Sequence, residues 1–212
     1  MVQLKSDRTE RSPRKQPSKF SFGIRADVKV RISLLGSGVQ QDKSCVVTNA
    51  TKTVVFSGCA DRLHEKVIRS ALETVMLVAL HPRSSISVTL QELHNDGGML
   101  AACINAAYLC AMDAAIATRC QVAAVHAAVM PDGTIQLDPT MDQEKEATAS
   151  CTFAFENQDL EVISVHTDGQ IPVDTLSKCM QVCSSAVEEV FEFYREAMAG
   201  RYNRHLPHEA DE

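Results

Sequence analysis

The chain has 212 residues, 45% of them hydrophobic, so it can bury a sizeable core as one large domain or two small ones. No run approaches the roughly 18 apolar residues of a membrane span, and no apolar signal segment follows Met1, so an intracellular protein is expected. The net charge is −6, but residues 1–19 hold six Lys or Arg against two acids, a net +4 that leaves −10 for the rest. The negative charge of the residues after 19 excludes a protein that binds nucleic acid over its whole surface.

The ends of the chain differ in composition from its middle. Residues 1–19 contain two prolines and almost no apolar side chains, which predicts a disordered basic tail. That tail could contact RNA or act as a localisation signal, although a solvated tail is the simpler interpretation. We expect a single folded domain over residues 20–203 and a flexible acidic tail over residues 204–212.

Strands are predicted first along the folded part. Residues 20–35 alternate apolar positions and indicate a strand that the glycines at 36–38 end. Residues 45–58 give two short β-branched runs split at Asn49, which suggests a hairpin or a bulged strand.

A helical period follows. Residues 61–80 carry apolar side chains three and four apart, which predicts an amphipathic helix ending before the sequence HPR. Residues 85–93 alternate as a half-buried strand does, the polar turn HNDGG comes next, and residues 99–117 are apolar nearly all round. A helix with that pattern is buried on every side.

The second half repeats this order of strands and helix. Strands are predicted at 121–129, 134–137, 150–155 and 161–166, and a long amphipathic helix at 174–199. The first two of these strands are joined by MPDG, which has the composition of a tight turn. Strands and long helices in such blocks predict an α+β fold with a mixed β-sheet packed on one side of the helices.

The eight cysteines are best explained as reduced core residues. They form no C-x-x-C pair, most have apolar neighbours, and an intracellular protein rarely keeps disulfides. Cys179 and Cys183 lie one helical turn apart and could share a metal, but no further ligand stands at a suitable spacing. We therefore expect no metal and no cofactor. The eight are Cys45, Cys59, Cys103, Cys110, Cys120, Cys151, Cys179 and Cys183.

Three stretches resemble a known family. HPRSSISVTLQELHNDGGMLAACINAA, then PDGTIQLDPTMDQEKEATASCTFAF, then VFEFYREAMAGRY are similar to the RNase PH-like subunits of the eukaryotic RNA exosome. Within that family the LDPT-x-x-QEKEA run and the FYRE-x-x-x-x-RY tail resemble the exosome component 5, or ribosomal RNA processing protein 46, type. The resemblance covers residues 61–202 and implies the RNase PH-like fold, which is of the ribosomal protein S5 domain 2-like kind. Upstream, NATKTVVFSG is similar to only one strand of the family, and a further strand pair is missing before the first helix.

The resemblance also implies where a phosphate would bind. Active members cleave RNA with inorganic phosphate, which they hold with a glycine turn followed by Thr-Arg at a helix start. Here Asp96-Gly97-Gly98 is retained, but the Thr-Arg positions hold Met99 and Leu100. An apolar side chain cannot replace the guanidinium fork, and the helix N-terminus alone is worth roughly 0.3 to 1 kcal/mol toward an anion.

Two further departures point the same way. The paired carboxylates that active members use for metal binding or proton transfer fall on Glu144 and Ser150, so the second acid is missing. An arginine of the first helix corresponds to Glu73, which reverses a charge where an RNA or phosphate anion should lie. We therefore predict a catalytically degenerate member that is not an enzyme.

Contacts with RNA remain open. Arg62, Lys66 and Arg69 share one helix face, and Arg83 stands in the HPR motif, so the four could form a basic patch along an RNA path. They could equally form a solvated face with Glu65 and Glu73 as ion-pair partners.

Other polar residues carry simpler interpretations. His126 lies in an apolar strand and is predicted to be a satisfied core histidine, and residues 143–146 are predicted to be a charged turn.

The predicted function is structural. The family's subunits form a six-membered ring with a central pore through which RNA reaches a separate nuclease, so a degenerate subunit can still complete the wall. The expected partners are other RNase PH-like subunits, cap proteins and RNA, without a membrane, and the expected location is nucleus, nucleolus and cytoplasm. One alternative is a residual phosphorolytic or hydrolytic exoribonuclease using Glu144 with Asp142, Glu146 or Asp138. Another is a free-standing RNA-binding module.

Overall fold

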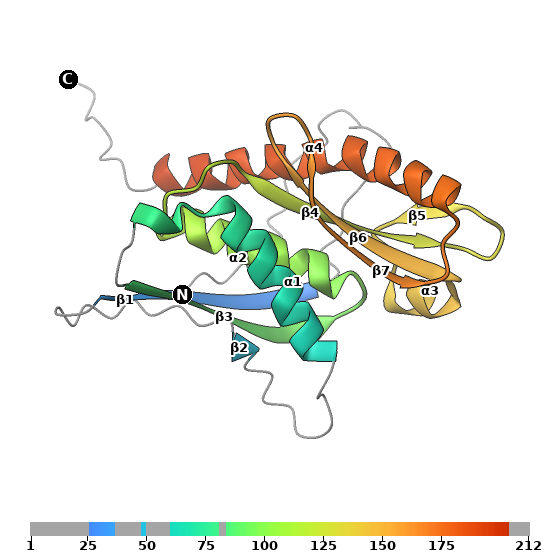
Figure 1. Cartoon of the computed structure of the whole chain (residues 1–212), viewed down its shortest axis with the longest axis horizontal. Coiled ribbons are helices and arrows are strands. Elements are labelled where there is room, and N and C mark those ends of the chain that lie inside the picture. Colours follow the sequence, from blue (N-terminus) through green and yellow to red (C-terminus); the bar gives the residue numbers. More distant parts are fainter. Residues whose placement is uncertain (1–25, 37–47, 50–59, 81–83, 204–212) are drawn as a thin grey trace, which may run out of the picture.

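A computed structural model describes residues 26–36, 48–49, 60–80 and 84–203 (Figure 1). The elements are β1 (Ala26–Gly36), β2 (Thr48–Asn49), α1 (Ala60–Val75), the 3-10 helix η1 (Val78–Leu80), β3 (Ser84–Asn95), α2 (Met99–Asp113), β4 (Val122–Val129), β5 (Ile135–Leu137), α3 (Met141–Glu146), β6 (Ala149–Glu156), β7 (Val162–Gly169) and α4 (Val173–Asn203). Helices and a largely antiparallel strand set confirm the predicted α+β class.

The strands form two sheets instead of the single one expected. The first has the order β1-β3-β2, with β2 parallel to β3, and the second has the order β5-β4-β6-β7 with antiparallel neighbours. Helix α4 covers one face of the second sheet, and α1 and α2 lie between its other face and the first sheet (Figure 1). The predicted packing of sheet on one side of the helices is therefore wrong for α2, which has a sheet on each side.

The composition of α2 explains how it fits between two sheets. Its small alanine side chains let the backbones of both sheets approach the helix closely. Ala107 and Ala111 have no exposed surface. Larger side chains such as Ile104 and Tyr108 fill the remaining space and are 1% exposed. The prediction of a buried helix is confirmed, since eight of the 15 residues of α2 are buried, but burial on every side is not, because Ala102, Ala106 and Leu109 are only half-buried. Neither sheet can cover its apolar face without α2.

An asparagine closes the part of β4 that β5 does not reach. The Asn105 amide donates from Nδ2 to the Ala124 carbonyl at 2.8 Å and accepts from the Ala124 N–H at 2.6 Å. The Tyr194 hydroxyl of α4 donates to the same Asn105 Oδ1 at 2.9 Å. Asn105 thus satisfies a buried backbone pair that no neighbouring strand covers.

Several predicted boundaries are corrected. The first helix ends at Val75, not at Leu80, because backbone groups there pair with the chain after α2: Leu77 N–H donates to the Ala117 carbonyl at 3.0 Å, and Arg119 N–H to the Val75 carbonyl at 2.8 Å. In the same way α2 ends at Asp113 and not at residue 117. By contrast β3 continues to Asn95, and α4 is longer than predicted at both ends.

A short helix replaces the charged turn predicted at 143–146. Thr140 begins α3 with a capping box, in which the Gln143 N–H donates to the Thr140 hydroxyl at 3.3 Å and the Thr140 N–H donates to Gln143 Oε1 at 2.9 Å. The sequence T-x-x-Q carried this signal.

Some predictions lie outside the described residues. These are the two tails and most of the predicted strand region at 45–58, of which only Thr48 and Asn49 are described. The predicted domain boundaries therefore stay predictions.

Candidate functional site

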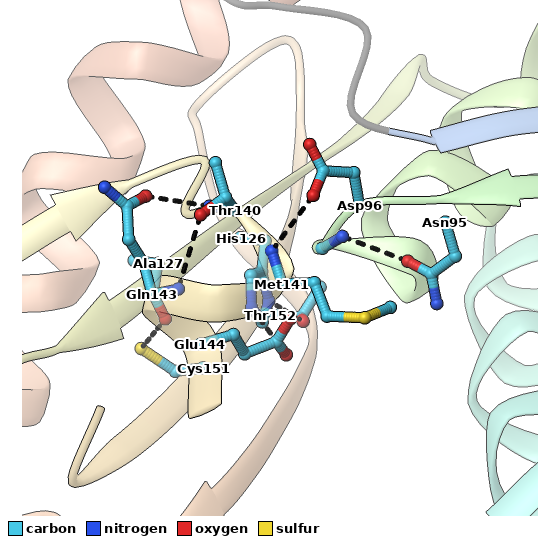
Figure 2. Close-up of polar contacts among 11 residues, drawn as sticks. Asn95, Asp96, His126, Ala127, Thr140, Met141, Gln143, Glu144, Cys151 and Thr152 are labelled. Atoms are coloured by element: carbon cyan, nitrogen blue, oxygen red, sulfur yellow. Dashed lines mark hydrogen bonds and ion pairs between the residues drawn. The ribbon is translucent and has the colours of Figure 1, made fainter. Parts of the chain in front are cut away.

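The glycine turn between β3 and α2 is held against the start of α3 (Figure 2). The Met141 N–H donates to the Asp96 carbonyl at 2.9 Å and also lies 3.4 Å from Asp96 Oδ1, the contact that Figure 2 draws. The Gly97 N–H donates to Asn95 Oδ1 at 3.0 Å. Gly97 has a φ of 106°, and a Cβ there would overlap the carbonyl oxygen of Pro139. Gly98 caps α2 with a φ of 60°, so both glycines are required by this backbone path.

The two residues after the turn cannot hold an anion. Leu100 is 5% exposed and belongs to the hydrophobic core, so the position where the resemblance places an arginine points inward. Met99 is partly exposed, and its thioether accepts a contact of 3.7 Å from the Cys103 thiol. Only the backbone N–H groups at the start of α2 remain available to a negative charge.

A carboxylate of the chain itself lies at that helix end. Glu144 on α3 has its Oε1 atom 3.2 Å from Nε2 of His126, which is 7% exposed on β4. The contact meets the distance criterion of an ion pair, which it becomes when the imidazole is protonated. On its other side, His126 Nδ1 lies 2.8 Å from the Thr152 hydroxyl of β6 (Figure 2). His126 is buried as predicted, but its partner is the one candidate acid that was retained.

The surroundings favour the charged form of Glu144. Interaction with His126 is the largest influence and holds the pKa of the Glu144 carboxyl below its ordinary value. Burial acts in the opposite direction, and the backbone N–H of Gly98 lowers the pKa further. The Glu144 carboxylate therefore lies near the N-terminus of α2, whose N–H groups favour a negative charge.

Ser150 stands at the position of the second acid, but another acidic residue lies on the same face of the sheet. Ser150 pairs across the ladder with Ala128 of β4 and with Asp168 of β7. Residues directly opposite each other in an antiparallel pair point to the same face, so Asp168 brings a carboxylate to the side of the sheet that carries Ser150. No sequence spacing reveals this neighbour, because the register between β6 and β7 decides it.

The other acids named for a residual site are scattered. Asp142 is 92% exposed and pairs with Lys145 at 3.4 Å, and Glu146 is exposed. Asp138 has a φ of 48° and lies near the turn, since a Cβ on Gly98 would be 3.7 Å from Asp138 Oδ1. Of the three, only Asp138 adjoins the N-terminus of α2.

The predicted basic face of α1 exists in part. Arg62, Lys66 and Arg69 are exposed, and Arg69 Nη2 lies 3.2 Å from Glu65 Oε1 on the same helix. Glu73, also exposed, continues the same face because it follows Arg69 by four residues. Arg83 lies outside the described residues. The patch is therefore a mixture of both signs in which one cation is already paired.

The described cysteines are buried. Cys151, Cys179 and Cys183 lie together between β6 and α4, and burial raises the pKa of each thiol, that of Cys183 to about 12. In the described ranges, no group of three His, Cys, Asp or Glu side chains is placed to hold a metal ion. No helix in the described part of the chain is long and apolar enough to cross a membrane.

Known proteins match this chain in sequence and in fold. Residues 8–117 match the model of the 3′ exoribonuclease family, domain 1, and residues 120–186 match domain 2 of that family. The crystal structure of rice (Oryza sativa) Rrp46 superposes with a TM-score of 0.73 at 22% identity, covering 82% of this chain and 84% of that one, which shows a shared fold.

Sequence relatives agree with the family models. The exosome complex exonuclease RRP46 homolog of Arabidopsis thaliana is 24% identical over 192 residues, 80% of each chain. The exosome complex component Rrp41 of Archaeoglobus fulgidus is 31% identical over 140 residues, 65% of this chain and 54% of the relative. Human exosome complex component RRP41 is 32% identical over 123 residues, 58% of this chain and 50% of the relative. The chain thus spans about half the length of these last two relatives.

The family models cover more than half of the chain in the expected order, and the fold agrees with that of rice Rrp46. The predicted RNase PH-like identity is confirmed, and the chain belongs to the 3′ exoribonuclease family.

Proposed function

We propose that this protein is a non-catalytic structural subunit of an RNA exosome ring. The observation that carries the proposal is the state of the α2 N-terminus, where Leu100 is turned into the core and the chain's own Glu144 carboxylate interacts with the Gly98 N–H. Inorganic phosphate approaching this place would meet a carboxylate, and the position where the resemblance places a guanidinium holds a buried leucine. The negative charges of phosphate and carboxylate repel each other. The site therefore disfavours phosphorolysis while the fold that surrounds it is kept.

Relatives support the assembly half of the proposal. The archaeal and human proteins are named as exosome complex components, and the Arabidopsis protein as an exosome complex exonuclease homolog. Large apolar side chains that remain exposed, including Val173 at 76% and Phe193 at 51%, are consistent with contacts to neighbouring chains. Its expected partners are other RNase PH-like subunits, cap proteins and RNA, and its expected place is the nucleus with its nucleolus and the cytoplasm.

The first test is the composition of the native complex. The tagged full chain should be recovered gently from its own cells, and the mass and stoichiometry of the recovered species measured. Equimolar recovery with several other RNase PH-like chains is the expected result. Recovery alone or as a homo-oligomer would contradict the ring.

Activity is tested separately on the purified chain. RNA is incubated with and without inorganic phosphate, and the release of nucleoside diphosphates is measured. The wild-type chain and Glu144→Gln should give the same release. Glu188→Gln, on the exposed side of α4, serves as the matched control. Phosphate-dependent release that Glu144→Gln abolishes and Glu188→Gln retains would refute the non-catalytic function.

A second candidate function is a residual nuclease. It is favoured by the His126–Glu144 pair, which brings an imidazole and a carboxylate within 3.2 Å of each other, and by the carboxylate of Asp168 opposite Ser150. If it holds, Asp168→Asn should lower RNA turnover as Glu144→Gln does, whereas Asp142→Asn should not.

A further inference from the structure

A cavity of about 450 Å³ opens at the opposite end of α2 from the glycine turn. It lies where α2, the start of β4, the β6–β7 connection and the C-terminal part of α4 meet. Figure 1 shows the C-terminal ends of α2 and α4 toward the same end of the molecule. Because α2 has 15 residues, the cavity is separated from the glycine turn by about 20 Å and is a different site.

The floor of the cavity is apolar and adaptable. Met112 and Met198 contribute flexible thioethers from α2 and α4, Ile116 adds a branched side chain, and Tyr108 lies beneath them at 1% exposure. Methionine side chains repack around ligands of different shape and make favourable contacts with aromatic rings. Such a floor suits large apolar or aromatic side chains.

The rim is polar and rich in donors. Arg119 is exposed beside the cavity, together with the carboxamides of Gln121, Asn157 and Gln158. The Gln121 N–H donates to Asn157 Oδ1 at 2.7 Å, so this oxygen is used and the NH2 group is what Asn157 can offer a ligand. The guanidinium of Arg119 is the group that can bind a carboxylate with two parallel hydrogen bonds.

An exposed apolar segment continues from this rim. Leu77, Val78 and Leu80 are 39%, 50% and 62% exposed. The backbone fixes them next to the loop that lines the cavity, because the Leu77 N–H donates to the Ala117 carbonyl and Met76 pairs with Thr118. A large exposed apolar surface next to a cavity is typical of a site for another protein chain.

The charges around the cavity limit the charge that a bound partner chain can carry. Arg119 and Glu156 both act on the thiol of Cys120 in the cavity wall, so a carboxylate lies close to the rim cation. The body of the protein is acidic as well, with −10 outside the first 19 residues. A ligand with one negative charge can pair with Arg119, whereas a polyanionic strand would meet mainly repulsion.

We propose that the cavity and the Leu77–Leu80 segment together bind an extended peptide of a partner protein, with large apolar side chains in the cavity and one neighbouring carboxylate on Arg119. This inference does not depend on the proposed ring function. Nucleotide binding at the same cavity is the competing outcome of the test.

The experiment uses the full chain with ¹³C-labelled methionine methyl groups. Met112 and Met198 report on the cavity, while Met99 and Met141 report on the distant glycine turn. The probes are the capped tripeptide acetyl-Leu-Asp-Phe-amide, its Asn counterpart acetyl-Leu-Asn-Phe-amide, and adenosine monophosphate. The proposal expects saturable shifts at Met112 and Met198 and none at Met99 or Met141, with the acidic tripeptide binding about fivefold tighter than its neutral counterpart.

Two variants assign the charge effect. Arg119→Gln should remove the preference for the acidic tripeptide, and Lys178→Gln, an exposed cation near the start of α4, should leave it unchanged. The proposal is overturned if neither tripeptide gives saturable shifts at Met112 and Met198, or if adenosine monophosphate binds there more tightly. Equal binding of both tripeptides by the wild-type chain would also overturn it.

Discussion

Individual residues at the α2 N-terminus show where a sequence pattern stops being informative. Glu144 was identified from the motif around it, whereas His126 was assigned to the core because its neighbours are apolar. The histidine is indeed in the core, with 7% of its surface exposed, and it also lies 3.2 Å from the Glu144 carboxylate. Glu144 lies on α3 and His126 on β4, so their contact depends on how these two elements pack.

The Glu144–His126 interaction predicts a pH dependence of stability. Because the pKa of Glu144 in the folded chain lies below its ordinary value of 4.5, its stabilising contribution is present above that pH and is lost as the pH falls through the lowered pKa. The difference in free energy of unfolding between the wild-type chain and Glu144→Gln should therefore shrink as acid is added. Urea unfolding at about pH 6 and about pH 3.5 measures it. Glu73→Gln is the control, and a difference that stays constant with pH would contradict the prediction.

At the scale of elements, the edges of β4 and the ends of helices were decided by contacts between distant segments. Asn105 is 19 residues before Ala124 in the sequence, and nothing in its helical surroundings indicates that it pairs with a strand. The loop at 117–119 likewise ends α1 by taking its backbone partners. Local propensity cannot include such partners, since they form only when the sheet and helices are packed.

Asn105 provides the prediction at this scale. Asn105→Ala leaves the N–H and carbonyl of Ala124, a residue 2% exposed, without their partners, so the free energy of unfolding should fall by about 2 to 4 kcal/mol. Tyr194→Phe, which removes one donor to the same amide, should cost about 1 kcal/mol. Urea unfolding checks both. Gln181→Ala on the exposed side of α4 is the matched control and should change stability by less than about 0.5 kcal/mol, and an Asn105→Ala variant equally stable would refute this role.

For the whole molecule, the central place of α2 joins the two sheets into one unit. The family models divide the chain near residues 117–120, but α2 from the first half packs on β4 and β6 of the second. Neither half can cover its apolar surface without the other. We therefore expect both to unfold together.

Ala107→Leu tests this unity. Ala107 has no exposed surface in the helix between the sheets, so a larger side chain should destabilise the protein by about 1 to 3 kcal/mol through overpacking. Tyrosine fluorescence, which is undisturbed by tryptophan in this chain, and far-UV circular dichroism should still give coincident transitions at a lower urea concentration. Ala199→Leu on the exposed part of α4 is the control. Separate transitions by the two probes would show that the halves are independent.

The sequence by itself determined the element types apart from α3, the buried nature of α2, the family and the loss of the Thr-Arg pair, because hydrophobic periodicity and short motifs are local properties of the chain. Tertiary structure decided that there are two sheets, that Leu100 faces the core, that Asp168 lies opposite Ser150, and that His126 meets Glu144. Each of these depends on register or on packing between segments far apart in the chain. Such contacts are fixed by burying all apolar faces at once, which no window of sequence can represent.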